Sequence, residues 1–154
     1  MSNRAAGGRR VLPPVYFLGG LLLMVGLHLA FPIRQVIPYP YRYTGVVLVL
    51  GGILLAGWAA WLFGRAGTTF KPFQESSALV VRGPYRVTRN PMYVGLVTVL
   101  SGIAVLLGSL SPGIIVPLFV AVLDRRFIRF EEAALERAFG AGYRDYKARV
   151  RRWL

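Results

Sequence analysis

Residues 91–123 read PMYVGLVTVLSGIAVLLGSLSPGIIVPLFVAVL, a run of 33 residues that carries no charged side chain. A helix of about 20 residues crosses the hydrocarbon core of a bilayer, so this run is too long for one ordinary crossing. The sequence SLSPG at residues 109–113 interrupts it with turn-forming residues. We therefore expect a helical hairpin with arms at residues 91–108 and 112–130. Proline at the start of each arm suits the first turn of a helix.

Two more apolar runs precede the hairpin. Residues 11–33 and 43–64 contain no Asp, Glu, Lys or Arg, and each is long enough to span a bilayer. The 154-residue chain is 55% hydrophobic and 16% charged, which is typical of a membrane protein. We predict one all-α integral membrane domain with about four transmembrane helices. Residues 1–66 hold the first two, and residues 67–154 hold a loop, the hairpin and a cytoplasmic amphipathic helix.

The basic residues lie mainly on one side of this plan. With a cytoplasmic N-terminus, 17 of the 19 Lys and Arg residues lie inside, and only Arg34 and Arg42 lie outside. This asymmetry is the positive-inside pattern. It accounts for the net charge of +13 without a nucleic-acid partner. We expect cytoplasmic termini, location in the plasma (inner) membrane, and a first helix that acts as an uncleaved signal anchor.

Few residues here could hold a metal ion or attack a substrate. The chain has no cysteine and one histidine, which excludes thiolate metal sites and a zinc site built from histidine alone. Asp124, Glu131 and Glu132 are a poor metal set because the surrounding arginines compete for their carboxylates, so we predict no metal site. His28 lies inside the first apolar run. We interpret it as a packing or hydrogen-bonding residue; the alternative is a functional intramembrane histidine, because polar groups in lipid are costly.

One polar cluster precedes the hairpin, where residues 82–95 read RGPYRVTRNPMYVG. Each proline disfavours helix in the residue before it, so this segment is expected to be an ordered turn. Arginine pairs with carboxylates through two parallel hydrogen bonds, and Arg89 lies nearest the hairpin. Tyr93 follows one turn later and could contact a cation or orient a ligand. The alternative is that these arginines only contact lipid headgroups.

A second polar cluster follows the hairpin, where residues 124–140 read DRRFIRFEEAALERAFG. The pattern predicts a helix with a stop at Gly140. Glu131 and Glu132 point about 100° apart, so we expect one to pair with an arginine and the other to face a ligand. Arg129 is spaced to pair with Glu132. The alternative is a salt-bridged interfacial helix, whose apolar stripe would press the tail against the membrane; that stripe is Leu135, Phe139 and Tyr143.

The two clusters together resemble the isoprenylcysteine carboxyl methyltransferase and phospholipid methyltransferase superfamily of membrane enzymes. The segments that carry the resemblance are GTT at residues 67–69, residues 79–95, EEAAL at 131–135, Phe139-Gly140, Tyr143, Tyr146 and VRRW at 150–153. The resemblance implies S-adenosylmethionine as methyl donor, bound by the loop and the paired glutamates. The cofactor-binding residues that it implies are Tyr85, Arg89, Asn90, Pro91, Tyr93, Gly95, Glu131 and Glu132, with Arg89, Asn90, Tyr93 and Glu132 also catalytic.

Two of these positions carry open questions. Asn90 stands where many members of the superfamily have histidine, and asparagine cannot titrate near neutral pH. Any mechanism that needs an acid or base there is therefore in doubt. Gly95 and Gly102 lie two turns apart, so they either let helices pack closely or leave room for a ligand.

The residue chemistry agrees with the resemblance. Arginine suits the carboxylate of S-adenosylmethionine, and glutamate suits its ammonium group or ribose diol. We expect methyl transfer to a lipidic or apolar small molecule at the membrane interface, with the acceptor and the oligomeric state left open. The alternatives are an NADPH-dependent membrane reductase of the steroid-reductase type and a non-enzymatic lipid-interacting membrane protein.

Overall fold

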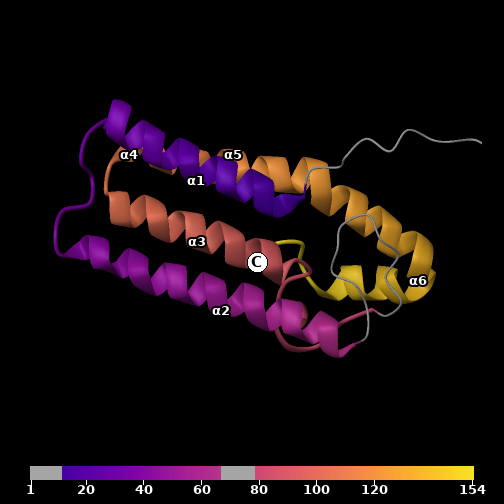
Figure 1. The fold of residues 1–154 in the computed structure, drawn as a ribbon. Helices are drawn as coiled ribbons and strands as arrows, with labels where there is room; N and C mark the ends of the chain where they lie inside the picture. Colours follow the sequence, from indigo (N-terminus) through magenta and orange to yellow (C-terminus); the bar gives the residue numbers. More distant parts are fainter. Residues whose placement is uncertain (1–11, 67–78) are drawn as a thin grey trace, which may run out of the picture.

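The computed structural model describes residues 12–66 and 79–154, and within these ranges the chain is helical with no β-strand. Residues 67–69 and the rest of the first half of the expected cofactor-binding loop, up to residue 78, lie outside the described residues. Figure 1 shows α1, α2, α3 and the α4–α5 arm running side by side, with α6 beyond one end of the bundle. The principal helices are α1 (Pro13–Ala30), α2 (Thr44–Arg65), α3 (Pro91–Leu107), α4 (Leu110–Gly113), α5 (Ile115–Leu123) and α6 (Arg129–Arg149).

The outer helices have the length and composition of membrane spans. Within the described residues, Pro13–Ala30 and Tyr41–Arg65 are long and apolar enough to cross a bilayer, and only 11% of each window is buried. A core helix of a soluble protein would be mostly buried, so these helices expose apolar faces as membrane helices do. The third apolar helix, α3, has 17 residues. The expected number of four crossings stays a prediction.

The hairpin prediction is confirmed. The first arm, α3, begins at Pro91 and ends at Gly108, whose φ of 72° is left-handed. A residue without Cβ suits this ending, and a Cβ there would collide with the guanidinium of Arg42. The second arm returns as α4 and α5. Residues 31–43 close this end of the bundle, because Val36 N–H donates to the Gly108 carbonyl at 2.9 Å.

His28 contacts the same turn. Its Nδ1 lies 2.7 Å from Ser109 Oγ, on the turn of the hairpin. This hydrogen bond ties the end of α1 to the hairpin, in agreement with our first interpretation of His28.

Glycines bring α2 and α3 into close contact. A Cβ added to Gly52 would lie 2.6 Å from the Gly95 carbonyl oxygen, and one added to Gly95 would lie 2.7 Å from that of Gly52. Gly45 and Gly102 form a second pair of the same kind. Of the two interpretations of Gly95 and Gly102, the structure supports helix packing.

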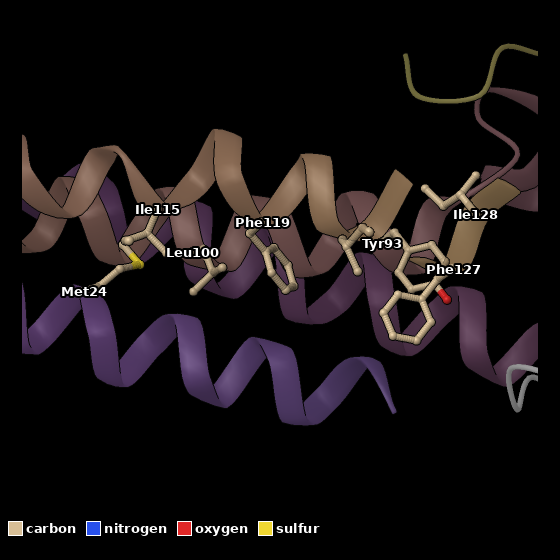
Figure 2. Packing of buried hydrophobic residues seen from close by; sticks show 8 residues of the cluster. Met24, Tyr93, Leu100, Ile115, Phe119, Phe127 and Ile128 are labelled. Carbon is tan, nitrogen blue, oxygen red and sulfur yellow. The ribbon is translucent and has the colours of Figure 1, made fainter. Parts of the chain in front are cut away.

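A buried apolar cluster holds the second arm of the hairpin against α1 and α3. It joins Met24 of α1 and Leu100 of α3 to Phe119 of α5, and it continues to Phe127 and Ile128 (Figure 2). These side chains are at most 4% exposed. Their packing fixes the far end of the second arm beside the start of the first.

The second arm continues without a break beyond the apolar run. A π-helical turn at Asp124–Ile128 (η3) joins α5 to α6. Gly140 has non-helical angles (φ 52°, ψ −119°), as expected of a helix stop, but a second helical stretch then continues to Arg149. Figure 1 shows the chain reversing there and returning towards the start of α3.

One predicted ion pair in this region is wrong. Arg129 bonds to Asp124, with Nε 2.8 Å from Oδ2, and does not contact Glu132. The π-helical turn changes which side chains share a face, and Glu132 is held by other arginines.

Candidate active site

A pocket opens where the end of α2, the start of α3 and both stretches of α6, before and after Gly140, meet. Its volume is about 570 Å³, open mouth included. Six of the eight expected site residues line it; they are Tyr85, Arg89, Asn90, Tyr93, Glu131 and Glu132. The two polar clusters that flank the hairpin in the sequence therefore lie together in space.

A short ion pair joins the two clusters directly. Arg89 Nη2 lies 3.0 Å from Glu132 Oε1, and both side chains are less than 10% exposed. A second link is the hydroxyl of Tyr93, which donates to Glu131 Oε1 at 2.6 Å. The hairpin makes these contacts possible because it returns the chain to the level at which it started.

Glu132 is fully occupied by arginines. Beside the contact with Arg89, Arg152 Nε lies 3.1 Å from Glu132 Oε1, and Arg152 Nη2 lies 2.7 Å from Oε2. Both carboxylate oxygens thus have charged partners. Of the two glutamates, Glu132 is the one that pairs with arginine, as expected for one member of the pair.

Glu131 has a different environment. Among the described residues its only hydrogen-bond partner is Tyr93, and no cation pairs with it. Burial raises the pKa of the Glu131 carboxyl, and the hydrogen bond from Tyr93 opposes this only in part. An ionised carboxylate of this kind is stabilised by any cation that enters the pocket.

Two donors at the pocket have no partner within the described residues. Tyr85 Oη and Arg89 Nε are buried and form no hydrogen bond. Burial raises the pKa of the Tyr85 hydroxyl, which stays protonated and able to donate. Leaving such groups unsatisfied costs about 1–3 kcal/mol each, so a ligand that accepts from them gains affinity.

The backbone around Tyr85 is held by α6. Tyr146 Oη donates to the Tyr85 carbonyl oxygen at 2.7 Å, and the Tyr85 ring packs edge-on against Phe63 of α2, with centroids 5.3 Å apart. These contacts fix the position of the Tyr85 hydroxyl at the pocket.

The side-chain amide of Asn90 binds the C-terminal segment. Its Nδ2 donates to the Arg152 carbonyl oxygen at 2.9 Å, so the amide holds the C-terminal segment. Pro91 begins α3, and Gly95 lies against α2; neither lines the pocket. The structure therefore does not bring these two residues to the place that the resemblance implied for them.

Several pocket residues were not singled out from the sequence. Only the fold brings together the apolar ones, which are Phe63, Leu79, Val80 and Met92. Leu135 and Tyr143, which we expected to press the tail against the membrane, line the pocket as well. The role of Arg152 was missed too. Its segment, VRRW, is one of those that carry the resemblance, but spacing alone does not show that it returns to residues 88–90.

Comparisons with known proteins identify the family of the chain. A sequence model of the phospholipid methyltransferase family matches residues 40–142, which include α2, the hairpin and the start of α6. An uncharacterized protein from Haemophilus influenzae is 40% identical over 63 residues, which are 41% of this chain and all of that protein.

A solved structure shares the fold. It is that of a eukaryotic intramembrane Ras methyltransferase, isoprenylcysteine carboxyl methyltransferase, with a TM-score of 0.65 and 23% identity. The match covers 89% of this chain, which spans half the length of that protein. Because the family model matches residues 40–142, which are most of its length, the chain belongs to the phospholipid methyltransferase family.

Proposed function

We propose that this protein transfers a methyl group from S-adenosylmethionine to a lipidic or apolar small molecule at the cytoplasmic face of the membrane. The observation that carries the proposal is that one pocket contains both a carboxylate and hydrogen-bond donors that lack partners in the described part of the chain. Among the described residues, no cation pairs with the Glu131 carboxylate, and Arg89 Nε and Tyr85 Oη have no hydrogen-bond acceptor. An amino acid derivative that carries an ammonium, a carboxylate and a sulfonium meets both needs.

The residues divide the work as follows. Arg89, with Tyr85 beside it, binds the carboxylate of the donor, and Glu131 binds its cationic part. Glu132 holds the Arg89 guanidinium in place through the 3.0 Å contact. Tyr93 orients Glu131 through its hydroxyl, and Asn90 fixes the C-terminal segment against the start of α3.

Positioning explains most of the rate that such a site can provide. S-adenosylmethionine supplies an electrophilic methyl group on its sulfonium. Holding an acceptor in line with that methyl group contributes up to about 7–11 kcal/mol. An amine or carboxylate acceptor already carries the lone pair, so Asn90 need not remove a proton. The aromatic side chains of Phe63, Tyr85 and Tyr93 exclude water from the reacting groups.

The lining of the pocket supports an apolar acceptor. Phe63, Leu79, Val80, Met92 and Leu135 form its apolar wall, near the end of α2. In the proposed membrane arrangement this wall lies at the interface, where the chain of a lipid can enter sideways from the bilayer.

Calorimetry tests the donor. We expect the purified protein in detergent to bind S-adenosylmethionine, and Arg89→Ala to weaken binding by about 10- to 100-fold, the value of a charge-assisted hydrogen bond. The matched control is Arg86→Ala, which removes an exposed arginine that does not line the pocket. Wild-type protein that binds no S-adenosylmethionine would refute the proposal.

A labelling experiment tests the acceptor. Membrane extract is incubated with protein and S-adenosylmethionine labelled on the methyl group, and label is expected in the organic phase. If S-adenosylmethionine is consumed but the methylated product stays in the aqueous phase, a lipidic acceptor is contradicted.

A further inference from the structure

The segment at residues 150–154 is docked onto the start of the hairpin. Arg89 N–H donates to the Arg151 carbonyl at 2.9 Å, and Thr88 Oγ1 donates to the Arg152 carbonyl at 3.1 Å. Asn90 Nδ2 donates to the same Arg152 oxygen. The indole of Trp153 packs against the buried cluster of Figure 2. This segment is therefore held by residues 88–90 and by the buried apolar cluster, next to Arg89.

The docking places the Arg152 guanidinium between two carboxylates. It binds both oxygens of Glu132, and its Nη1 lies 3.2 Å from Asp124 Oδ1. The hydrogen bond to Glu132 raises the pKa of Arg152, with a further contribution from Asp124, so its charge is secure. Arg152 does not line the pocket, and any effect on a ligand must act through its neighbours.

Arg89 and Arg152 compete for the carboxylate oxygens of Glu132, and this competition determines how Arg89 is bound. Arginine and carboxylate prefer to pair through two parallel hydrogen bonds. Because Arg152 takes Oε2 and shares Oε1, Arg89 has one oxygen of Glu132 left to contact, and its Nε has no partner among the described residues. Without Arg152, the carboxylate could turn and bind Arg89 through both oxygens, which would draw that guanidinium away from the ligand.

We propose that Arg152 is a positioning residue of the active site: by holding both oxygens of Glu132, it keeps part of the Arg89 guanidinium free for the carboxylate of the methyl donor. This inference rests on the proposed function. It assigns a role in donor binding to a residue outside both polar clusters that flank the hairpin.

The neighbouring arginine provides a matched control. Arg151 is exposed, and among the described contacts its side chain has no partner; only its backbone carbonyl takes part in the docking. Arg151→Ala and Arg152→Ala thus remove the same charge and the same side chain from adjacent positions. Only the second change removes the contacts with Glu132 and Asp124.

The test measures the KM values for S-adenosylmethionine and for the acceptor separately. We expect Arg152→Ala to raise the KM for S-adenosylmethionine about tenfold, with the KM for the acceptor changed less than twofold. Arg152→Lys keeps the charge but lacks the planar fork, and should recover part of the loss. Arg151→Ala should stay within twofold of wild type. Equal effects of the two alanine variants, or equal changes in both KM values, would overturn the inference.

A second measurement keeps the inference separable from the proposed function. Thermal unfolding of Arg152→Ala, Glu132→Gln and the double variant should show non-additive effects, because the two side chains share their bonds. If wild-type protein binds no S-adenosylmethionine, the proposed function fails. Additive effects on unfolding would instead reject the pairing of Arg152 with Glu132. If Arg152→Ala does not fold, Arg152→Lys decides between the outcomes.

Discussion

Two adjacent glutamates on one helix have opposite environments in this protein. Glu132 is bound by Arg89 and Arg152, whereas Glu131 contacts a tyrosine hydroxyl. The sequence predicts such a split, because neighbours on a helix point about 100° apart. It could not show which glutamate pairs with arginine, since that depends on Arg152 returning from a distant part of the chain.

The raised pKa of Glu131 should affect both the stability of the protein and its affinity for S-adenosylmethionine. The folded protein holds this proton more tightly than the unfolded chain, so Glu131 lowers stability as pH rises above the ordinary glutamate range. We expect Glu131→Gln to raise the Tm at pH 8 while it weakens S-adenosylmethionine binding about 10- to 100-fold. At pH 5 the difference in Tm should shrink, because the wild-type carboxyl is then increasingly protonated.

Differential scanning fluorimetry and calorimetry check this pair of effects. Glu136→Gln serves as the control, because Glu136 pairs with Lys147 at the surface and should change neither quantity much. A lower Tm for Glu131→Gln at pH 8 would mean that Glu131 serves structure and not ligand binding.

At the scale of helices, the hairpin was predictable and the helix contacts were not. The hairpin is a local property of one apolar run with a Ser-Pro-Gly interruption. The contact between α2 and α3 depends on glycines about 40 residues apart, such as Gly52 and Gly95, and one sequence does not show which glycines face each other. The resemblance implies Gly95 at the cofactor, whereas the structure places it against Gly52 and Ala56 of α2.

Adjacent glycines of α2 test this contact. Gly52→Ala should destabilise the protein by about 1–3 kcal/mol, because the added Cβ meets the backbone of α3. Gly51→Ala should change stability by less than about 0.5 kcal/mol, because nothing lies within 4 Å of its added Cβ. Thermal unfolding in one detergent compares them, and equal losses would contradict the close helix contact.

At the scale of the whole molecule, the bundle has two chemically different ends. Arg34 and Arg42 belong to the loop that closes the hairpin turn, while the pocket and α6 lie at the other end. The sequence predicts this polarity from charge alone, because the positive-inside pattern needs only the order of apolar runs. It could not predict the pocket wall, which is assembled from α2, residues 79–80, α3 and α6.

The absence of cysteine makes this polarity easy to measure. Tyr41 is 65% exposed near the hairpin turn, and Ala141 is exposed in α6. In intact cells, a membrane-impermeant maleimide should label Tyr41→Cys and spare Ala141→Cys, and permeabilised cells should show label on both. The reverse pattern in intact cells would place the active site on the outer face.

The π-helical turn at Asp124–Ile128 has a consequence for how this site can vary among relatives. A turn closed over five residues holds one residue more than an α-helical turn, and each residue rotates a helix by about 100°. Deleting a single residue there would restore a regular helix and rotate Glu131 away from Tyr93 and Glu132 away from Arg89. Homologues that keep the acidic pair should therefore keep the length of this turn as well.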